Sequence, residues 1–228
     1  MRERHRRALA LSAFGAIAVA SLVGVGIMSR DLPSLQASTP PTPRAQAAPS
    51  STSGSHGDGY SRAQFGAPWA DVDGNGCPTN LDVLARWLTD VVLAPDGCTV
   101  LSGVLVDPYT EQTVRYMRGA RPQPVQMDHV VPLHVAWHGG LDVAQPATRL
   151  AFANDTSNLL PTTLNSSKGD DGPARLLERR KAGRDRWQPT PAGECRYAQA
   201  YVLADAEWRL RTSDADEAAL AEMLRACP

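Results

Sequence analysis

Residues 126–170 constrain the fold of this chain more than any other segment. A valine-rich apolar run surrounds residues 128–129 and stops at Pro132, a pattern typical of a short strand closed by proline. Residues 158–160, Asn-Leu-Leu, predict a second strand, and residues 165–169 predict the opening of a short helix. We therefore expect a strand–strand–helix unit here, with the rest of the chain supporting it.

The polar side chains of this segment suit the hydrolysis of a phosphodiester. The reaction needs a base that takes a proton from water near neutral pH, which suits His129. A hard divalent cation offsets the developing charge and prefers oxygen ligands, which Asp128 and Asn165 would supply. Lys168 could hold a phosphate as a point charge. Because neighbours on a regular strand point to opposite faces, Asp128 and His129 can share a site only if the strand ends or distorts there.

The ordered set resembles the HNH endonucleases of the ββα-metal (His-Me finger) fold. The matching residues are Asp128-His129-Val-Val-Pro, then Asn158-Leu, then Asn165-x-x-Lys168-Gly-Asp. The branch it most resembles is the C-terminal-domain type of the GmrSD restriction endonuclease, in a secreted single-domain form. The core motif covers about a fifth of the chain, and a looser match extends over residues 71–227.

The resemblance implies a role for each matching residue. His129 is expected to be the general base, Asp128 and Asn165 to hold one divalent metal, Mg²⁺ or Mn²⁺, and Asn158 to brace the turn between the two strands. The last motif position is Asn165 rather than His, a variation that several branches of the family share. The Cys-x-x-Cys zinc knuckles of some relatives are absent, so no structural zinc is expected.

Neighbouring polar residues leave alternatives open. His134, Trp137 and His138 are expected on one short helix, where packing or substrate contact is favoured over metal ligation. The pair at residues 154–155, Asn-Asp, could cap the next element or join the metal shell, and the cap is favoured. Residues 71–82 fit the spacing of a calcium loop, but the twelfth position is Asp rather than Glu. A turn-rich entry to a helix is the preferred interpretation of that segment.

The segments around the motif predict an α+β fold. We expect an N-terminal helix, a hairpin leading into the motif, and closing helices after it. The expected ranges are a helix over residues 81–92, strands over 99–106 and 113–117, and helices from 172–173, over 194–210 and over 214–226, the last capped by Ser213 or Asp214.

The N-terminal part of the chain has the composition of an export segment and a linker. Residues 1–30 combine an arginine cluster with 21 uncharged, mostly apolar residues at 8–28, which indicates either a cleaved signal peptide or a single membrane anchor. Residues 31–60 are rich in Pro, Ser, Thr, Ala and Gly and predict a disordered linker. Residues 61–228 are expected to form the HNH endonuclease domain outside the cytoplasm.

Charge limits how the domain could hold nucleic acid. Residues 48–228 contain 17 basic and 22 acidic side chains, a net charge of −5, which argues against tight, stable DNA binding. Residues 168–186 are locally basic, with seven basic and four acidic side chains. We expect Lys168, Arg175 and Arg179 to contact substrate, although a solvated helix face explains the arginines equally well.

Four cysteines follow the export segment. An even number in an oxidising compartment predicts two disulfides, and three pairings are open. The local pairing is preferred, with Cys77 bonded to Cys98 and Cys195 to Cys227, because each bond would tie a helix to its neighbouring segment.

Two function classes remain after this reasoning. One is an exported, metal-dependent endonuclease of low sequence specificity, with DNA favoured over RNA as its substrate. The other is a non-catalytic extracytoplasmic binding module that keeps the HNH fold. The presence of Asp128, His129 and Asn165 together favours the enzyme.

Overall fold

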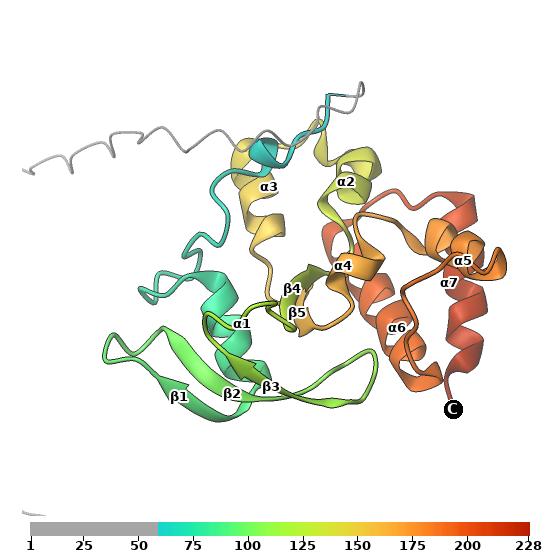
Figure 1. Cartoon of the computed structure of the whole chain (residues 1–228). Helices are drawn as coiled ribbons and strands as arrows, with labels where there is room; N and C mark the ends of the chain where they lie inside the picture. The colour runs from blue at the N-terminus through green and yellow to red at the C-terminus, as the bar shows by residue number, and fades with distance from the viewer. Residues whose placement is uncertain (1–58) are drawn as a thin grey trace, which may run out of the picture. The chain divides into compact units, whose positions relative to one another are not determined.

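The computed structural model describes residues 59–228 of the chain (Figure 1). The predicted export segment and nearly all of the predicted linker lie outside these described residues. Among residues 59–228, no helix combines the length and the apolar character needed to cross a membrane.

The described residues form a mixed α+β fold, as the sequence predicts. Its elements, in chain order, are η1 (Arg62–Phe65), α1 (Thr79–Trp87), β1 (Thr89–Leu93), β2 (Val100–Val106), β3 (Thr113–Met117), β4 (Gln126–His129), α2 (Leu133–Ala136), η2 (Trp137–Leu141), α3 (Pro146–Ala153), β5 (Leu159–Thr162), α4 (Asn165–Lys168), α5 (Pro173–Lys181), α6 (Pro191–Trp208), α7 (Asp214–Met223) and η3 (Leu224–Ala226).

The strands form two separate antiparallel sheets. The first has the order β1-β2-β3, and its β2–β3 pairing is the predicted hairpin. The second contains β4 and β5, with Asp128 opposite Leu160 and His129 opposite Leu159. The short helix α4 follows β5 directly and packs against β4, so the strand–strand–helix unit expected over residues 126–170 is present as a local arrangement.

The helix predicted over residues 81–92 is wrong beyond Trp87. The helix ends there, and residues 89–93 form β1, an edge strand paired with β2. The sequence Val-Val-Leu at 91–93 favours a strand, and the ladder offered by β2 satisfies its backbone groups. Asp90, with φ of 50°, lies at a register shift that lets the chain turn from helix into strand. Leu88, the C-cap of α1, still packs with Leu81 and Leu84, whereas Val92 lies in β1 and is exposed.

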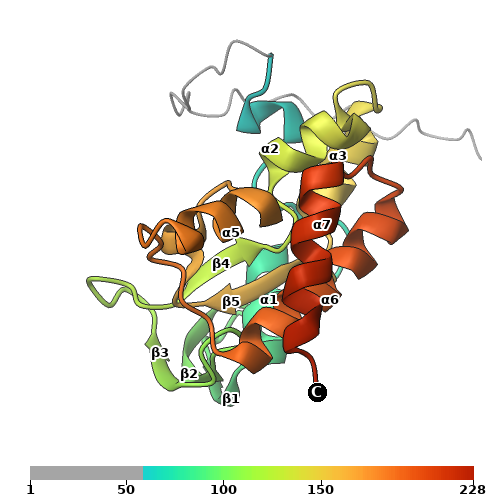
Figure 2. The ribbon, with the colours of Figure 1, turned by 90° about the vertical axis from the view of Figure 1, so that its right-hand side faces the viewer.

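The C-terminal helices α5, α6 and α7 form a layer beside the β4–β5 pair, as Figure 2 shows. Helix α6 begins at Pro191, earlier than predicted, because the Thr190 hydroxyl accepts the Gly193 N–H as an N-cap. The start of α6 lies so close to Tyr109 that a Cβ atom on Gly193 would lie 1.9 Å from the Tyr109 carbonyl oxygen. Glycine is therefore required where α6 crosses the β2–β3 turn. Ser213 caps α7 as predicted.

Both disulfides have the preferred local pairing. Cys77 is bonded to Cys98, which ties the loop before α1 to the turn between β1 and β2. Cys195 is bonded to Cys227, which ties α6 to the C-terminal residues. All four cysteines are used in these two bonds.

Candidate functional site

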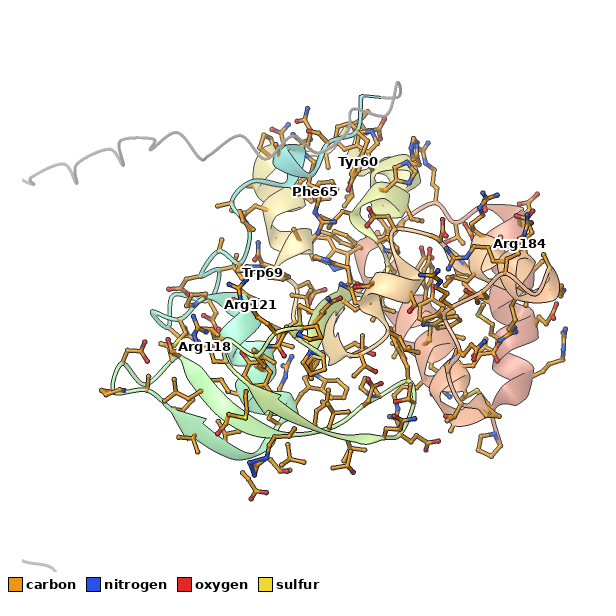
Figure 3. The ribbon with its side chains drawn as sticks, viewed as in Figure 1. Tyr60, Phe65, Trp69, Arg118, Arg121 and Arg184 are labelled. Carbon is orange, nitrogen blue, oxygen red and sulfur yellow. A yellow bond between two sulfur atoms is a disulfide. The ribbon has the colours of Figure 1, made fainter. Side chains whose placement is uncertain are left out.

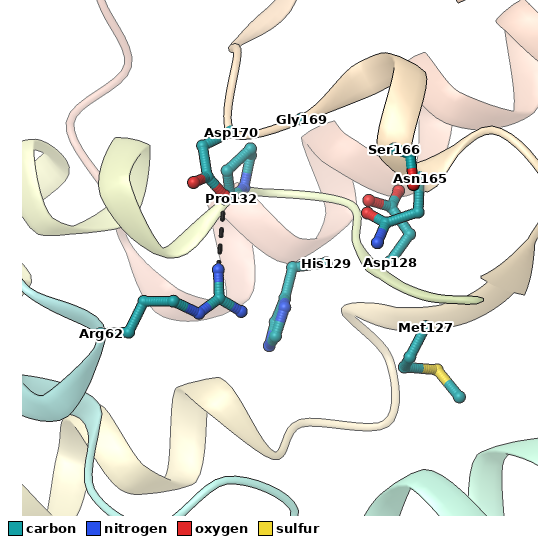
Figure 4. A pocket seen from close by; sticks show the side chains of 9 residues that line it. All are labelled: Arg62, Met127, Asp128, His129, Pro132, Asn165, Ser166, Gly169 and Asp170. Carbon is teal, nitrogen blue, oxygen red and sulfur yellow. Dashed lines mark hydrogen bonds and ion pairs between the residues drawn. The ribbon is translucent and has the colours of Figure 1, made fainter. Parts of the chain in front are cut away.

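One pocket collects the central residues of the sequence motif. Its volume is about 160 Å³, and it lies where the end of β4 meets α4 (Figure 4). The lining residues are Arg62, Met127, Asp128, His129, Pro132, Asn165, Ser166, Gly169 and Asp170. Because β4 ends at His129, the strict alternation of side chains ends there too, and Asp128 and His129 both reach the same pocket.

His129 is held in one orientation and one tautomer. Its Nε2 atom lies 2.9 Å from the carbonyl oxygen of Ala153. A carbonyl oxygen can only accept, so Nε2 carries the ring hydrogen and Nδ1 keeps its lone pair. Burial lowers the pKa of His129 from 6.5 to about 4, although the hydrogen bond to Ala153 acts in the opposite direction. Trp69 stacks on the imidazole, with ring centroids 6.0 Å apart. The ring is therefore a neutral base at physiological pH.

Asp128 is a buried carboxylate with two strong partners. The Tyr109 hydroxyl donates to its Oδ2 at 3.0 Å, and the Lys168 ammonium lies 3.2 Å from its Oδ1. Burial raises the pKa of Asp128, and the charge of Lys168 opposes that rise. Each carboxylate oxygen has a second lone pair, so these contacts leave acceptor sites for a further partner.

Lys168 differs from its expected role as a substrate contact. Its side chain is 0% exposed and does not line the pocket. Besides the ion pair with Asp128, its Nζ donates to the His129 carbonyl oxygen at 3.0 Å. An ammonium can be buried at low cost only beside an opposite charge, so Lys168 fixes Asp128 and the end of β4 rather than a phosphate.

Asn158 holds the end of β4 against the start of β5. Its side-chain Oδ1 accepts the Val131 N–H at 2.8 Å, and its Nδ2 donates to the Val131 carbonyl at 3.1 Å. Its backbone carbonyl also accepts the Val130 N–H. Asn158 is fully buried and lies outside the pocket lining, which is the geometry expected of a brace rather than a ligand.

Asn165 begins α4 and lines the pocket on the same side as Asp128 in the view of Figure 4. The loop that carries it is fixed by Asp107, whose carboxylate accepts from the Thr163 N–H and from the hydroxyls of Thr162 and Thr163. Burial raises the pKa of Asp107, but these hydrogen bonds outweigh it and leave the pKa below its usual value. Asp107 therefore positions Asn165 through its loop.

The two arginines predicted to contact substrate do not line this pocket. Arg179 pairs with Asp171 and, at 3.1 Å, with Asp185. Arg175 is exposed and pairs with Glu178 at 3.2 Å. Among the described lining residues, the permanent positive charge belongs to Arg62, which sequence reasoning did not single out.

The neighbouring polar groups lie apart from the pocket. His134 and His138 approach each other with Nε2 atoms 3.2 Å apart on α2 and η2. The carboxylate of Asp155 accepts from Ser157 and from the Trp208 indole, which makes it part of the turn before β5. The segment at residues 71–82, for which the sequence favours a turn-rich entry to a helix over a calcium loop, is closed by Asp71, which accepts three backbone N–H groups. No cluster of three or more His, Cys, Asp or Glu side chains is arranged around a metal within residues 59–228.

Four residues in or around the pocket were not predicted from the sequence. They are Arg62, Trp69, Asp107 and Tyr109. Asp107 also fixes the turn between β2 and β3, because its carboxylate accepts the N–H of Tyr109. Nothing local in the sequence indicates that these side chains also reach the motif. An Asp two residues before an aromatic residue in a turn is the sequence signal that could have suggested it.

The chain is similar to a secreted protein of a fungus. Over 176 residues it is 34% identical to the "Uncharacterized secreted protein" of Arthroderma benhamiae, and the match covers 75% of this chain and 76% of that protein. No family model matches the chain. No solved structure matches it either.

Proposed function

This chain belongs to the same family as the secreted Arthroderma benhamiae protein, and we propose that it is an exported, metal-dependent endonuclease of the HNH type. The proposed reaction is hydrolysis of phosphodiester bonds in DNA with low sequence specificity. An extracytoplasmic location agrees with the secreted relative and with two disulfides, which persist in oxidising compartments.

The observation that carries the proposal is the convergence of three side chains in one pocket. Asp128 and His129 come from the end of β4, and Asn165 comes from the start of α4. They supply a carboxylate, an imidazole base and an amide oxygen, which is the set that metal-assisted phosphodiester hydrolysis needs. The β4–β5–α4 arrangement around them supports assignment to the ββα-metal fold.

His129 has the properties of a general base. The Ala153 carbonyl fixes the hydrogen on Nε2, which leaves Nδ1 to accept a proton from a water molecule. The lowered pKa keeps the ring neutral, and therefore able to accept that proton, over the whole physiological range. Stacking on Trp69 and burial restrict the ring to one orientation, which favours a positioned base.

Asp128 and Asn165 are the residues that would hold a divalent metal. A carboxylate and an amide oxygen suit Mg²⁺ or Mn²⁺, which keep several water ligands and need few protein ligands. A bound ion would supply Lewis-acid stabilisation of the charge that develops on the phosphate and the leaving oxygen. The Lys168 ammonium and the Tyr109 hydroxyl hold the Asp128 carboxylate in place for this role.

A nicking assay on supercoiled plasmid tests the proposal with the full chain. Cleavage should require Mg²⁺ or Mn²⁺ and stop when a chelator is added. His129→Ala should fold, should still bind metal and should cut roughly 100-fold more slowly or worse at every metal concentration. Asp128→Ala and Asn165→Ala should instead shift the metal dependence to higher concentrations, because each removes an oxygen ligand.

The alternative is a binding module that keeps the fold without cutting. It predicts no metal-dependent nicking by the wild-type chain under any of these conditions. Wild-type rates in His129→Ala would also reject the assigned base. Thermal melts of each variant distinguish loss of chemistry from loss of folding, and this is most needed for Asn158→Ala, whose buried contacts are structural.

A further inference from the structure

We propose that Arg62 is the phosphate-binding residue of the pocket, and that Asp170 holds its guanidinium until a substrate phosphate displaces it. The inference deepens the proposed function and rests on it. It places the substrate contact on the segment before α1, 64 residues before the start of the motif segment at residue 126.

The first reason is the distribution of positive charge around the site. Lys168 is fully buried beside Asp128, and Arg179 is held between Asp171 and Asp185. Among the described residues that line the pocket, Arg62 carries the permanent positive charge (Figure 4). An incoming phosphodiester adds negative charge beside two carboxylates, Asp128 and Asp170, and needs such a partner.

The second reason is that the backbone carrying Arg62 is anchored while its side chain is open to solvent. Phe65, on the same helical turn, is 2% exposed and packs against Trp137 and Phe152. The Arg149 guanidinium donates to the Gln64 carbonyl at 2.7 Å. Figure 3 shows Phe65 directed into the protein from this segment. A fixed backbone with a solvent-exposed guanidinium suits a residue that binds ligand at low entropic cost.

The third reason is that the contact between Arg62 and Asp170 is weak enough to exchange. A single N–O distance of 3.4 Å joins the two side chains, which are 47% and 56% exposed. Ion pairs this exposed contribute little, so a phosphate can displace the carboxylate. A guanidinium binds phosphate through two parallel hydrogen bonds and gains more from it than from one long contact. The ion pair of Lys168 and Asp128 is buried, at 0% and 1% exposure, so an incoming phosphate cannot displace it in the same way.

The proposal predicts opposite effects from the two partners. Arg62→Ala should weaken binding of a labelled DNA duplex by about tenfold or more, because it removes a charge-assisted contact. Arg62→Lys should recover part of that loss, since it keeps the charge without the bidentate geometry. Asp170→Asn should tighten binding by roughly 2- to 5-fold, because it removes the competitor for the guanidinium. In the Arg62→Ala background, Asp170→Asn should give a smaller gain, because only the repulsion between the carboxylate and the phosphate is relieved.

The assay is fluorescence anisotropy with the full chain and a short labelled duplex in chelator, so that binding is measured without cleavage. Parallel nicking assays in Mg²⁺ or Mn²⁺ should show the same order in KM. Arg115→Gln and Asp142→Asn are the matched controls, because they make the same charge changes at exposed positions outside the pocket lining. The affinity of these two controls for the duplex should change less, relative to wild type, than the affinity of Arg62→Ala or Asp170→Asn changes.

The possible outcomes distinguish failure of the Arg62 phosphate contact from failure of the proposed nuclease activity. Unchanged binding and KM in Arg62→Ala, with a wild-type chain that cuts DNA, would overturn the role of Arg62 alone. Weaker binding in Asp170→Asn would show that the pair is structural and would also overturn it. A wild-type chain that binds the duplex through Arg62 without cutting would refute the nuclease while supporting the phosphate contact. A chain that neither binds nor cuts would refute both.

Discussion

Replacement of Lys168 by methionine tests the buried ion pair that fixes Asp128. Methionine fills most of the space of the lysine stem but removes the ammonium, which lies 3.2 Å from Asp128 Oδ1 and 3.0 Å from the His129 carbonyl oxygen. Both ion-pair partners are at most 1% exposed, so water cannot solvate the Asp128 carboxylate once the ammonium is removed. Removal of one partner of such a pair costs about 3–5 kcal/mol, a large part of the total stability of a domain.

The measurement is urea unfolding of the full chain with disulfides intact, followed by tryptophan fluorescence. Lys168→Met should lower the unfolding free energy by about 3–5 kcal/mol, and Asp128→Asn alone should also be destabilising. The double variant should recover most of the loss, because two neutral side chains remain. A Lys168→Met protein within about 0.5 kcal/mol of wild type would refute the buried role and return Lys168 to the candidates for phosphate contact.

Three further changes test other parts of the structure. The pKa of His129 falls from 6.5 to about 4 on folding, so the unfolded chain binds more protons than the folded chain between these pH values. The unfolding free energy should therefore be complete above pH 6.5 and fall by an amount on the order of 3 kcal/mol towards pH 4. Urea titrations in chelator should find this loss in the wild-type chain and not in His129→Gln. Gly193→Ala should destabilise the fold by about 2–3 kcal/mol in the same assay, because its Cβ would overlap the Tyr109 carbonyl. Loss of the Cys77–Cys98 bond, which closes a loop of 21 residues, should cost about 3 kcal/mol in thermal or urea unfolding of the double serine variant. Wild-type stability of Gly193→Ala would reject the close approach to Tyr109, and wild-type stability of the double serine variant would reject the stabilising role of the disulfide.

The sequence alone determined the elements whose signals are local. The Ser213 cap is a short pattern, and α7 begins where that pattern predicts it. The valine-rich run closed by Pro132 predicted a strand only in part, because β4 ends at His129, before Val130 and Val131. The cysteine pairing could also be predicted, because short chain separation favours local bonds. These features depend on residues that are close to each other in the chain, so they can be predicted from the sequence.

Tertiary structure decided which charges face the pocket. Lys168 and Arg62 are both basic residues in polar surroundings of the sequence, yet one is fully buried beside Asp128 and the other lines the pocket. Whether a cation is available to a ligand depends on which carboxylate folding brings next to it. The partners here are 40 and 108 residues apart, and no local pattern encodes such distances.

The same reason explains the element that was predicted wrongly. The segment after Trp87 has apolar spacing compatible with a helix, but β2 offers a ladder of backbone hydrogen bonds that outweighs this weak preference. Tyr109 likewise reaches Asp128 only because α6 and the β2–β3 turn pack against the β4–β5 pair. Local pattern thus located the residues that we propose as base and oxygen ligands, His129, Asp128 and Asn165, while long-range packing determined their surroundings, their orientation and the cation beside them.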